Sequence, residues 1–236
     1  MTDATLNYNP HANISVVRIG HEQSPLIVID DFVTAPELLL EYAQTGEGFH
    51  NAQSDFYPGV QKKLPALYAT IVHNWVIKYL AETAQLPLIS HASISFCALS
   101  VANQDPDSLL PIQRIPHFDT CNSQQWAMVH YLCDESFGGT GFFRHISSGF
   151  ECIIPQRQKR YQRLLEDEAS TKGLPQPGYL QGNSELFKMI YTVPLKYNRA
   201  LLYPSNLLHS GLIQQWQSKC PWAGRLTANS FCQITG

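Results

Sequence analysis

Two residues in the middle of the chain, His117 and Asp119, could together bind a metal ion. They stand in "RIPHFDTC", one residue apart. In an extended strand, side chains two positions apart point the same way, so an imidazole and a carboxylate would reach one point. Two histidines and one carboxylate on one face of an octahedron form a protein site for non-haem Fe(II) and leave three positions open. The pair therefore predicts two of three ligands and requires a second histidine.

His209 is the candidate for this third ligand, and a basic residue follows it. It stands in "ALLYPSNLLHSGL", after an apolar strand and a Pro-Ser-Asn turn. Further on, "GRLTANSF" places Arg225 and Thr227 on one face of a strand. A guanidinium in an apolar barrel is costly unless it meets an anion, and its planar fork suits a carboxylate. Taken singly, these residues have ordinary alternatives. His117 and Asp119 fit a structural pair, His209 fits a histidine in a turn, and Arg225 fits a surface residue of a strand.

The elements that must position these residues are mostly strands. From residue 90 onward, "SHASISFCALSVA", "QQWAMVHYLCD", "GGTGFFRH", "RALLYPS" and "RLTANSFCQIT" are rich in strand formers and lie between Gly, Pro and Asn. Several short strands with turn signals predict a barrel or jelly roll. Within "QQWAMVHYLCD", His130 and Tyr131 alternate across the strand, and we expect Tyr131 to face the cavity.

The first third of the chain has a mixed pattern. A strand is predicted at residues 26–29, and a helix after Thr34, which with Glu37 fits a capping box. A second helix is predicted within residues 62–84. We expect one domain over residues 1–236, with residues 1–89 as an α/β support region and residues 90–236 as the core. The predicted fold class is mainly β with N-terminal and inserted helices, as a double-stranded β-helix (a jelly roll or cupin-like barrel).

An insertion interrupts the predicted strands at about residues 150–185. Its first half is predicted to be a helix with the basic residues Arg157, Lys159, Arg160 and Arg163, and its second half is a Pro/Gly-rich loop. A solvated helix with local charge pairs explains this pattern, and a lid over the barrel mouth is the alternative. The role of His145, just before the insertion, stays open between a contact at the barrel mouth, a metal ligand and a plain loop residue.

Composition narrows the class of protein. The chain has 236 residues, a net charge of −3 and only 15% charged residues, so no global basic field would attract nucleic acid. The N-terminus lacks a basic segment followed by an apolar run, and no stretch is apolar for the roughly 18 residues of a membrane span. We therefore expect a cytoplasmic protein with neither a nucleic acid nor a membrane as partner; the oligomeric state is open.

The ordered set of motifs resembles a known superfamily. His-x-Asp, "YLCDESFGGTGFF", "VPLKYNRALLYPSNLLHSGL" and "GRLTANSFC" follow one another as in Fe(II)/2-oxoglutarate-dependent dioxygenases, and are most similar to the prolyl 4-hydroxylase-like branch. The resemblance covers roughly residues 90–233, and "IVIDDFVTAPELL" is similar to the opening of that branch. The strand before His-x-Asp lacks the tyrosine usual there, which leaves the substrate class in doubt.

The resemblance implies both an activity and a set of roles. His117, Asp119 and His209 would bind Fe(II), Arg225 would bind the distal carboxylate of the cosubstrate 2-oxoglutarate with help from Thr227, and Tyr131 is a weaker candidate for a cosubstrate contact. The enzyme would hydroxylate a peptidyl or small-molecule substrate and release succinate and CO2. Because Asp119 is present, hydroxylation is favoured over halogenation. A jelly roll that binds a metal or small molecule without turnover, or one that only binds proteins, is the alternative.

Overall fold

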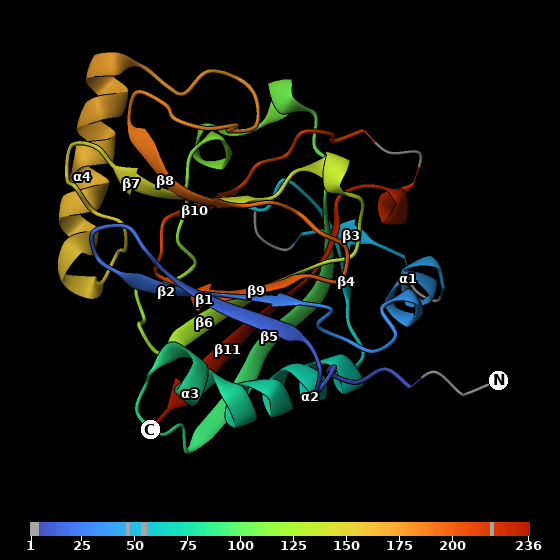
Figure 1. Cartoon of the computed structure of the whole chain (residues 1–236). Helices are drawn as coiled ribbons and strands as arrows, with labels where there is room; N and C mark the ends of the chain where they lie inside the picture. The colour runs from blue at the N-terminus through green and yellow to red at the C-terminus, as the bar shows by residue number, and fades with distance from the viewer. Residues whose placement is uncertain (1–4, 46–47, 53–55, 218–219) are drawn as a thin grey trace.

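The computed structural model describes residues 5–45, 48–52, 56–217 and 220–236, and two facing β-sheets dominate it. Figure 1 shows the larger sheet between the smaller sheet on one side and helices α2 and α3 on the other. The helices are α1 (Glu37–Gln44), α2 (Ala66–Trp75), a π-helical turn (Val76–Leu80), α3 (Ala81–Ala84) and α4 (Pro155–Lys172), with 3-10 turns at Pro106–Ser108, Pro111–Arg114, Glu135–Phe137 and Pro221–Ala223. The arrangement is the predicted double-stranded β-helix, mainly β with N-terminal and inserted helices.

The larger sheet has eight strands in the order β1-β2-β9-β6-β11-β5-β4-β3, and the smaller has three in the order β10-β7-β8. All the pairings are antiparallel. The strands are β1 (Asn13–Ile19), β2 (Ser24–Asp30), β3 (His50–Asn51), β4 (Gly59–Lys63), β5 (His91–Ala102), β6 (Gln125–Tyr131), β7 (Thr140–His145), β8 (Phe187–Val193), β9 (Ala200–Pro204), β10 (His209–Gly211) and β11 (Leu226–Thr235). Four of the eight strands in the larger sheet thus come from the first 89 residues.

The two faces of the larger sheet have different partners. On the outer face, α2 buries Tyr68, Ile71, Val72 and Trp75, which recur at helical spacing. Leu67, which stands four residues before Ile71, is 53% exposed and lies outside this stripe. On the inner face, side chains of β6, β9 and β11 meet those of the smaller sheet in a second apolar cluster.

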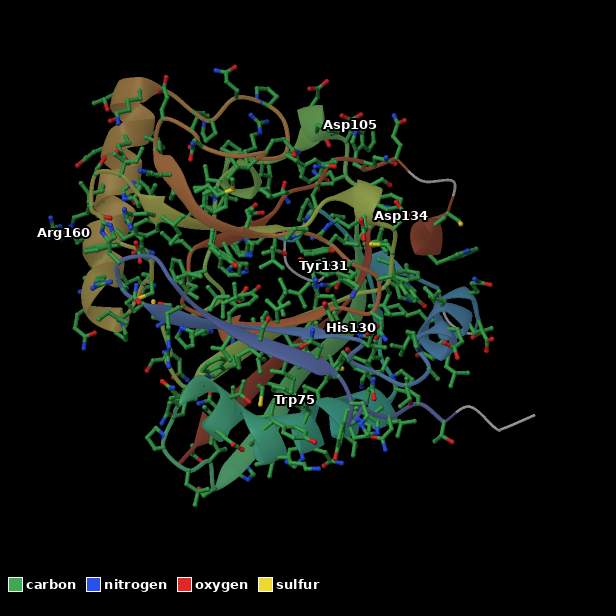
Figure 2. All side chains as sticks on the ribbon, in the orientation of Figure 1. Trp75, Asp105, His130, Tyr131, Asp134 and Arg160 are labelled. Carbon is green, nitrogen blue, oxygen red and sulfur yellow. The ribbon has the colours of Figure 1, made fainter. Side chains whose placement is uncertain are left out.

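His130 and Tyr131 lie on opposite faces, as predicted. His130 contacts Tyr68 and Phe32 on the helix side, and its ring bonds to the Tyr68 hydroxyl at 2.9 Å. Tyr131 belongs to the inner cluster, and its hydroxyl lies 2.7 Å from Thr140 Oγ1. Figure 2 shows His130 toward Trp75 and Tyr131 on the side of the smaller sheet. Only Tyr131 therefore faces the space between the sheets.

Local signals in the sequence misplaced one cap and missed several strands. Helix α1 has Pro36 at its N-cap and no side-chain cap, so the predicted capping box is wrong. The Thr34 hydroxyl instead donates to the Thr5 carbonyl at 2.7 Å and so holds the N-terminal segment. Strands β1, β3, β4, β8 and β10 were not predicted. Strands β3 and β10 have only two and three residues and depend on their neighbours for pairing, whereas β1 and β8 have seven residues each, as many as β2 and β6, so their length does not explain the miss.

Helix α4 packs at the edge of the smaller sheet, and its contacts are mostly not local charge pairs. Arg157 bonds to Glu22 in the β1–β2 turn, with 2.8 Å between Nη1 and Oε1. His145 is fully buried and bonds to Glu168 of α4, with 2.8 Å between Nε2 and Oε2. His145 therefore anchors α4 and makes no contact at the barrel mouth. One local pair, Glu168 with Lys172, is present at 3.3 Å.

The Glu151 carboxylate joins the β1–β2 turn to the smaller sheet. It is fully buried, bonds to Arg144, and accepts the backbone N–H groups of His21 and Glu22 at 3.0 and 2.9 Å. Burial alone would raise the pKa of Glu151, but these hydrogen bonds outweigh it and the pKa is lowered.

Replacing Glu151 with glutamine should destabilise the fold by roughly 3 kcal/mol at pH 7, because Arg144 would keep its charge without a partner. A carboxylate with a lowered pKa stabilises the native state above its unfolded pKa and loses this effect as the pH falls. The difference between wild type and Glu151→Gln should therefore shrink below pH 4.5. Urea unfolding at pH 7 and again below pH 4.5 measures this difference in the free energy of unfolding. Glu166→Gln, at an exposed position of α4, is the control and should stay within about 0.5 kcal/mol of wild type.

Candidate metal and carboxylate site

His117 and Asp119 are brought together by a bridge and a bend. The predicted strand for this pair is wrong: His117 forms an isolated antiparallel bridge with His209, and Asp119 lies in a bend. The bridge has two hydrogen bonds, from His117 N to His209 O at 2.9 Å and from His209 N to His117 O at 2.8 Å. The Asp119 N–H donates to the Ser205 carbonyl at 2.8 Å. Backbone pairing with the segment around His209 thus sets both side chains.

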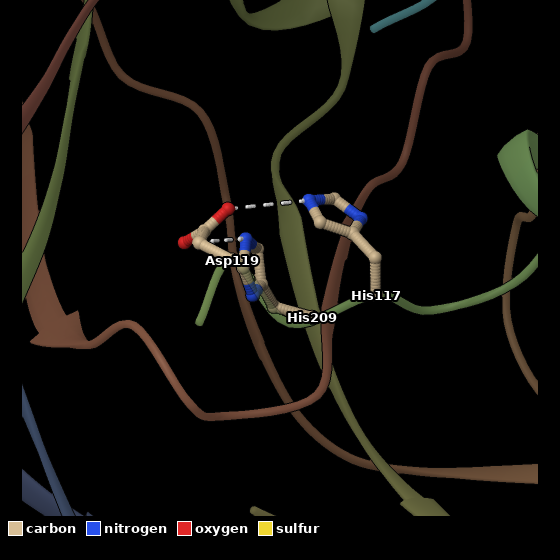
Figure 3. Close-up of side chains that lie close together, drawn as sticks. All are labelled: His117, Asp119 and His209. Carbon is tan, nitrogen blue, oxygen red and sulfur yellow. Dashed lines mark ion pairs between the residues drawn. The ribbon is translucent and has the colours of Figure 1, made fainter. Parts of the chain in front are cut away.

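The three side chains meet at one point, as Figure 3 shows. His117 Nε2 lies 3.8 Å from Asp119 Oδ1, and His209 Nε2 lies 3.9 Å from Asp119 Oδ2. One ligand atom from each residue lies within 4.8 Å of the others. His209 Nδ1 lies 2.9 Å from the Leu207 carbonyl, so it carries the proton and leaves the Nε2 lone pair directed at Asp119.

Asp119 shows why a cation fits this cluster. Its Oδ2 is buried and has no hydrogen-bond partner within the described residues. Burial raises the pKa of Asp119 to about 6, against the effect of His117. Burial also lowers the pKa of His209 to about 4, against the hydrogen bond to Leu207. Near neutral pH the imidazole is therefore neutral and the carboxylate mostly ionised, which is the protonation state that metal ligands need.

His117 differs from the other two residues in being open to solvent. Its side chain is 52% exposed, against 14% for Asp119 and 7% for His209. Burial of its inner edge and the neighbouring His209 lower the pKa of His117, against the effect of Asp119. A bound ion would thus be held from inside and approached from the His117 side.

Aromatic rings support the cluster from behind. Phe118, between His117 and Asp119, packs edge-to-face on Tyr161 of α4 with 6.1 Å between ring centroids. The ring of Tyr203 lies 4.9 Å from that of His209. The helix of the insertion therefore supports the site. The segment after α4 contacts the approach to His117, since Arg114 bonds to the Pro175 carbonyl and the Tyr179 hydroxyl to the Gln104 carbonyl.

Arg225 is a buried cation without an anion. Its side chain is buried, with the residue 6% exposed, and it forms no ion pair with any residue that the structure describes. Nε donates to the Gly138 carbonyl at 3.0 Å and Nη2 to the Gly139 carbonyl at 2.8 Å. These bonds use one edge of the guanidinium and leave the Nη1 side without a hydrogen bond among the described residues. A carboxylate could bind there with two parallel hydrogen bonds.

Gly211 connects the arginine to the metal cluster. A Cβ atom on Gly211 would lie 3.5 Å from Arg225 Nη1. Gly211 follows His209 by two residues in β10, so it faces the same way, roughly 7 Å further along the strand. The buried cation and the three metal-ligand candidates thus open onto the same face of β10.

The structure places the other predicted contacts around Arg225. The ring centre of Tyr131 lies 5.6 Å from Arg225 Cζ. Thr227 lies opposite Tyr131 on the inner face, but its hydroxyl bonds to the Ser100 carbonyl at 3.3 Å. Tyr57, in the Tyr-Pro-Gly turn of residues 57–59, also lies near this group: the Arg225 charge acts to lower the pKa of its phenol, although burial dominates and raises this pKa. The turn is a local pattern that is compatible with a place at the site, but only the fold brings Tyr57 close to Arg225.

Gly139 should be intolerant of a side chain, because its carbonyl helps to hold Arg225. A Cβ on Gly139 would lie 2.0 Å from the Val193 carbonyl oxygen. We expect Gly139→Ala to cost roughly 1–3 kcal/mol of stability through the forced backbone shift and to weaken anion binding by Arg225. Thermal unfolding measures the first effect. Gly182→Ala, where a Cβ meets nothing within 4 Å, is the matched control and should leave the melting temperature within a degree or two.

A known protein family matches nearly the whole chain. Residues 10–232 match the model described as "Family of unknown function (DUF6445)". The chain belongs to this family. The matched part of this DUF6445 protein contains His117, Asp119, His209 and Arg225, so the whole candidate site lies within the family's common region. A comparison with curated proteins gave no match.

Solved structures give a distant likeness to the DUF6445 chain. HygX from Streptomyces hygroscopicus with nickel and 2-oxoglutarate bound has a TM-score of 0.49 and 12% identity, over 91% of this chain and 84% of HygX. HygX with nickel, 2-oxoglutarate and hygromycin B bound has a TM-score of 0.44 and 12% identity, over 93% and 88% of the two chains. These bound groups are properties of HygX. In the described ranges of the DUF6445 chain, no helix combines the length and apolar character of a membrane span.

Proposed function

We propose that the chain is an Fe(II)- and 2-oxoglutarate-dependent oxygenase that hydroxylates a peptidyl or small-molecule substrate. The proposal rests on two buried charged side chains, a carboxylate and a guanidinium, that open onto one face of β10 and have no counterion among the described residues. Among the described residues, Asp119 Oδ2 is buried without a partner beside two imidazoles that are candidates for metal ligands, and Arg225 is buried without an anion. A cation at the first place and a carboxylate at the second satisfy both.

The ligand atoms of the three-residue cluster fit Fe(II). Two imidazoles and one carboxylate form the facial set that leaves positions open on iron. His117, Asp119 and His209 would hold the ion, and the Leu207 carbonyl fixes the ring of His209. Bound Fe(II) with 2-oxoglutarate would supply the oxidation of a C–H bond, with succinate and CO2 as coproducts. The order of motifs in the sequence supports the assignment to this superfamily, and that resemblance alone supports its prolyl 4-hydroxylase-like branch.

The chain's own residues would position the cosubstrate and shield it. Arg225 would bind the distal carboxylate on its Nη1 side while Gly138 and Gly139 hold the other edge. Tyr131 would pack against the guanidinium and limit its access to water. The Thr227 hydroxyl donates to the Ser100 carbonyl and so supports the sheet beside Arg225. Rotation of this hydroxyl would let it assist Arg225 in binding the carboxylate.

The substrate would approach from the open side of His117. A groove of about 460 Å³ lies between the β3–β4 hairpin and the segment that leads to His117, and its lining includes the polar residues Tyr57, Asn103 and Gln113. A peptide segment and a small metabolite both remain candidates, with neither nucleic acid nor a membrane expected as partner and the cytoplasm as the expected compartment.

The test is turnover of 2-oxoglutarate in air. Protein with Fe(II), ascorbate and 2-oxoglutarate should release succinate, faster when a peptide library or a metabolite extract supplies the substrate, and His209→Ala should release none. Binding of both ligands without succinate under any of these conditions would overturn the enzyme proposal in favour of a silent binding module.

A further inference from the structure

Asn229 stands out because its side-chain oxygen is buried without a hydrogen-bond partner among the described residues. Only two side-chain atoms in the described part of the chain are buried without a hydrogen-bond partner, Asp119 Oδ2 and Asn229 Oδ1. The amide Nδ2 of Asn229 also forms no hydrogen bond within the described residues, and it is not among the buried unpaired atoms. A buried amide oxygen without a partner costs about 1–3 kcal/mol. Such an exception in a folded protein calls for a functional reason.

The register of β11 places Asn229 on the inner face of the larger sheet. Asn229 lies opposite Val129 of β6 and alternates with Ala228, which packs in the cluster on the helix side. Val129 and Phe231 both belong to the inner cluster. The carboxamide therefore points into the space between the two sheets, where the metal and carboxylate site lies.

Solvent reaches the inner face at this point. Val129, Asn229 and Phe231 are partly exposed although they lie in central strands, whereas Met128 and Ala228 are buried against the helices. The sheets are thus not in full contact over Asn229. Since Oδ1 is the buried end of the amide, Nδ2 is the end that this opening can reach.

Asn229 also lies between the two halves of the proposed site. On one side, Phe231 shares a row with Ala127 and Tyr203, and the Tyr203 ring contacts His209. On the other side, Thr227 shares a row with Tyr131, which contacts Arg225. The inner face therefore leads from the metal cluster past Asn229 to the buried arginine.

We propose that Asn229 binds the 2-oxo acid cosubstrate by donating a hydrogen bond from Nδ2 to one of its oxygens between the metal and Arg225. This inference rests on the proposed function. A 2-oxo dicarboxylate has only acceptor oxygens, so an amide N–H is the chemical complement that it needs there. This bond to a charged acceptor would occupy Nδ2, whereas Oδ1 stays buried without a partner among the described residues.

The experiment measures the two affinities separately under anaerobic conditions: the Fe(II) affinity by equilibrium competition with a metal chelator, and the 2-oxoglutarate affinity by titration of the Fe(II)-loaded protein followed by visible absorption. Asn229→Leu, which keeps the volume and removes the donor, should weaken 2-oxoglutarate binding about tenfold. Asn229→Asp, which adds repulsion between carboxylates, should weaken it more. Both variants should keep the Fe(II) affinity within about twofold, because Asn229 is not a metal ligand. Asn74→Asp on the exposed part of α2 is the matched control, without effect on either affinity.

Three results separate this inference from the proposed function. If the wild type binds 2-oxoglutarate and both Asn229 variants bind it equally well, the inference is wrong and the proposed function stands. If the Fe(II) affinity falls as much as the 2-oxoglutarate affinity, Asn229 has a structural role and the inference is also wrong. If the wild type itself binds no 2-oxoglutarate, the proposed function fails first.

Discussion

His209→Ala should reduce the affinity for Fe(II) by at least about 100-fold, because it removes one of three protein ligands and the one whose ring is fixed by the Leu207 carbonyl. Equilibrium competition with a metal chelator under anaerobic conditions measures the effect. His91→Ala, at an exposed position at the start of β5, is the matched control and should bind as the wild type does.

A second variant guards against a loss of folding in His209→Ala. Asp119→Asn keeps the shape of the side chain and removes the negative charge, so it should also lose the metal. It should unfold at the same temperature as the metal-free wild type or at a higher one, since it removes a buried oxygen without a partner. A variant that is stable and still binds Fe(II) with wild-type affinity would show that Asp119 is not a ligand.

Arg225→Met should weaken 2-oxoglutarate binding by about 100-fold, equivalent to about 2.7 kcal/mol, through loss of the charge-assisted hydrogen bonds to a carboxylate. Methionine retains much of the buried volume, so the inner cluster should stay packed. The Fe(II) affinity should remain unchanged, because Arg225 binds backbone carbonyls and no metal-ligand candidate.

Comparison with an exposed arginine decides the interpretation of this result. Arg163→Met on α4 changes the net charge of the protein by the same amount without touching the site. If both arginine variants weaken 2-oxoglutarate binding equally, the effect is one of overall charge. If Arg225→Met binds 2-oxoglutarate as tightly as the wild type, the carboxylate site lies elsewhere.

The metal-ligand candidates could be found from sequence because each carries its chemistry in its residue type. The reason that they converge could not be found, since the strand predicted for His117 and Asp119 is a bridge to His209 from a distant segment. Alternation in β6 predicted that His130 and Tyr131 lie on opposite faces, and the structure confirms this, with the favoured Tyr131 on the inner face. A period of two is a strong signal where both faces are buried by different partners.

Other features depend on tertiary contacts that no local pattern records. Only the structure shows that Arg225 has no ion-pair partner, because it shows that no carboxylate of the described residues reaches the guanidinium. The sequence shows Asn229 only as a polar residue of a strand, and it does not show that its Oδ1 is buried without a partner among the described residues. His145 was open between three roles, and its bond to Glu168 in the helix of the insertion gives it a different one, which is to anchor α4.

The central claim is that one site binds Fe(II) and 2-oxoglutarate together, through the three-residue cluster and Arg225. Anaerobic addition of both to the protein tests it most directly. The account predicts a visible metal-to-ligand charge-transfer band that requires both additions, disappears in His209→Ala, and needs a much higher 2-oxoglutarate concentration in Arg225→Met. A wild-type protein that gives no band at saturating Fe(II) and 2-oxoglutarate would contradict the account.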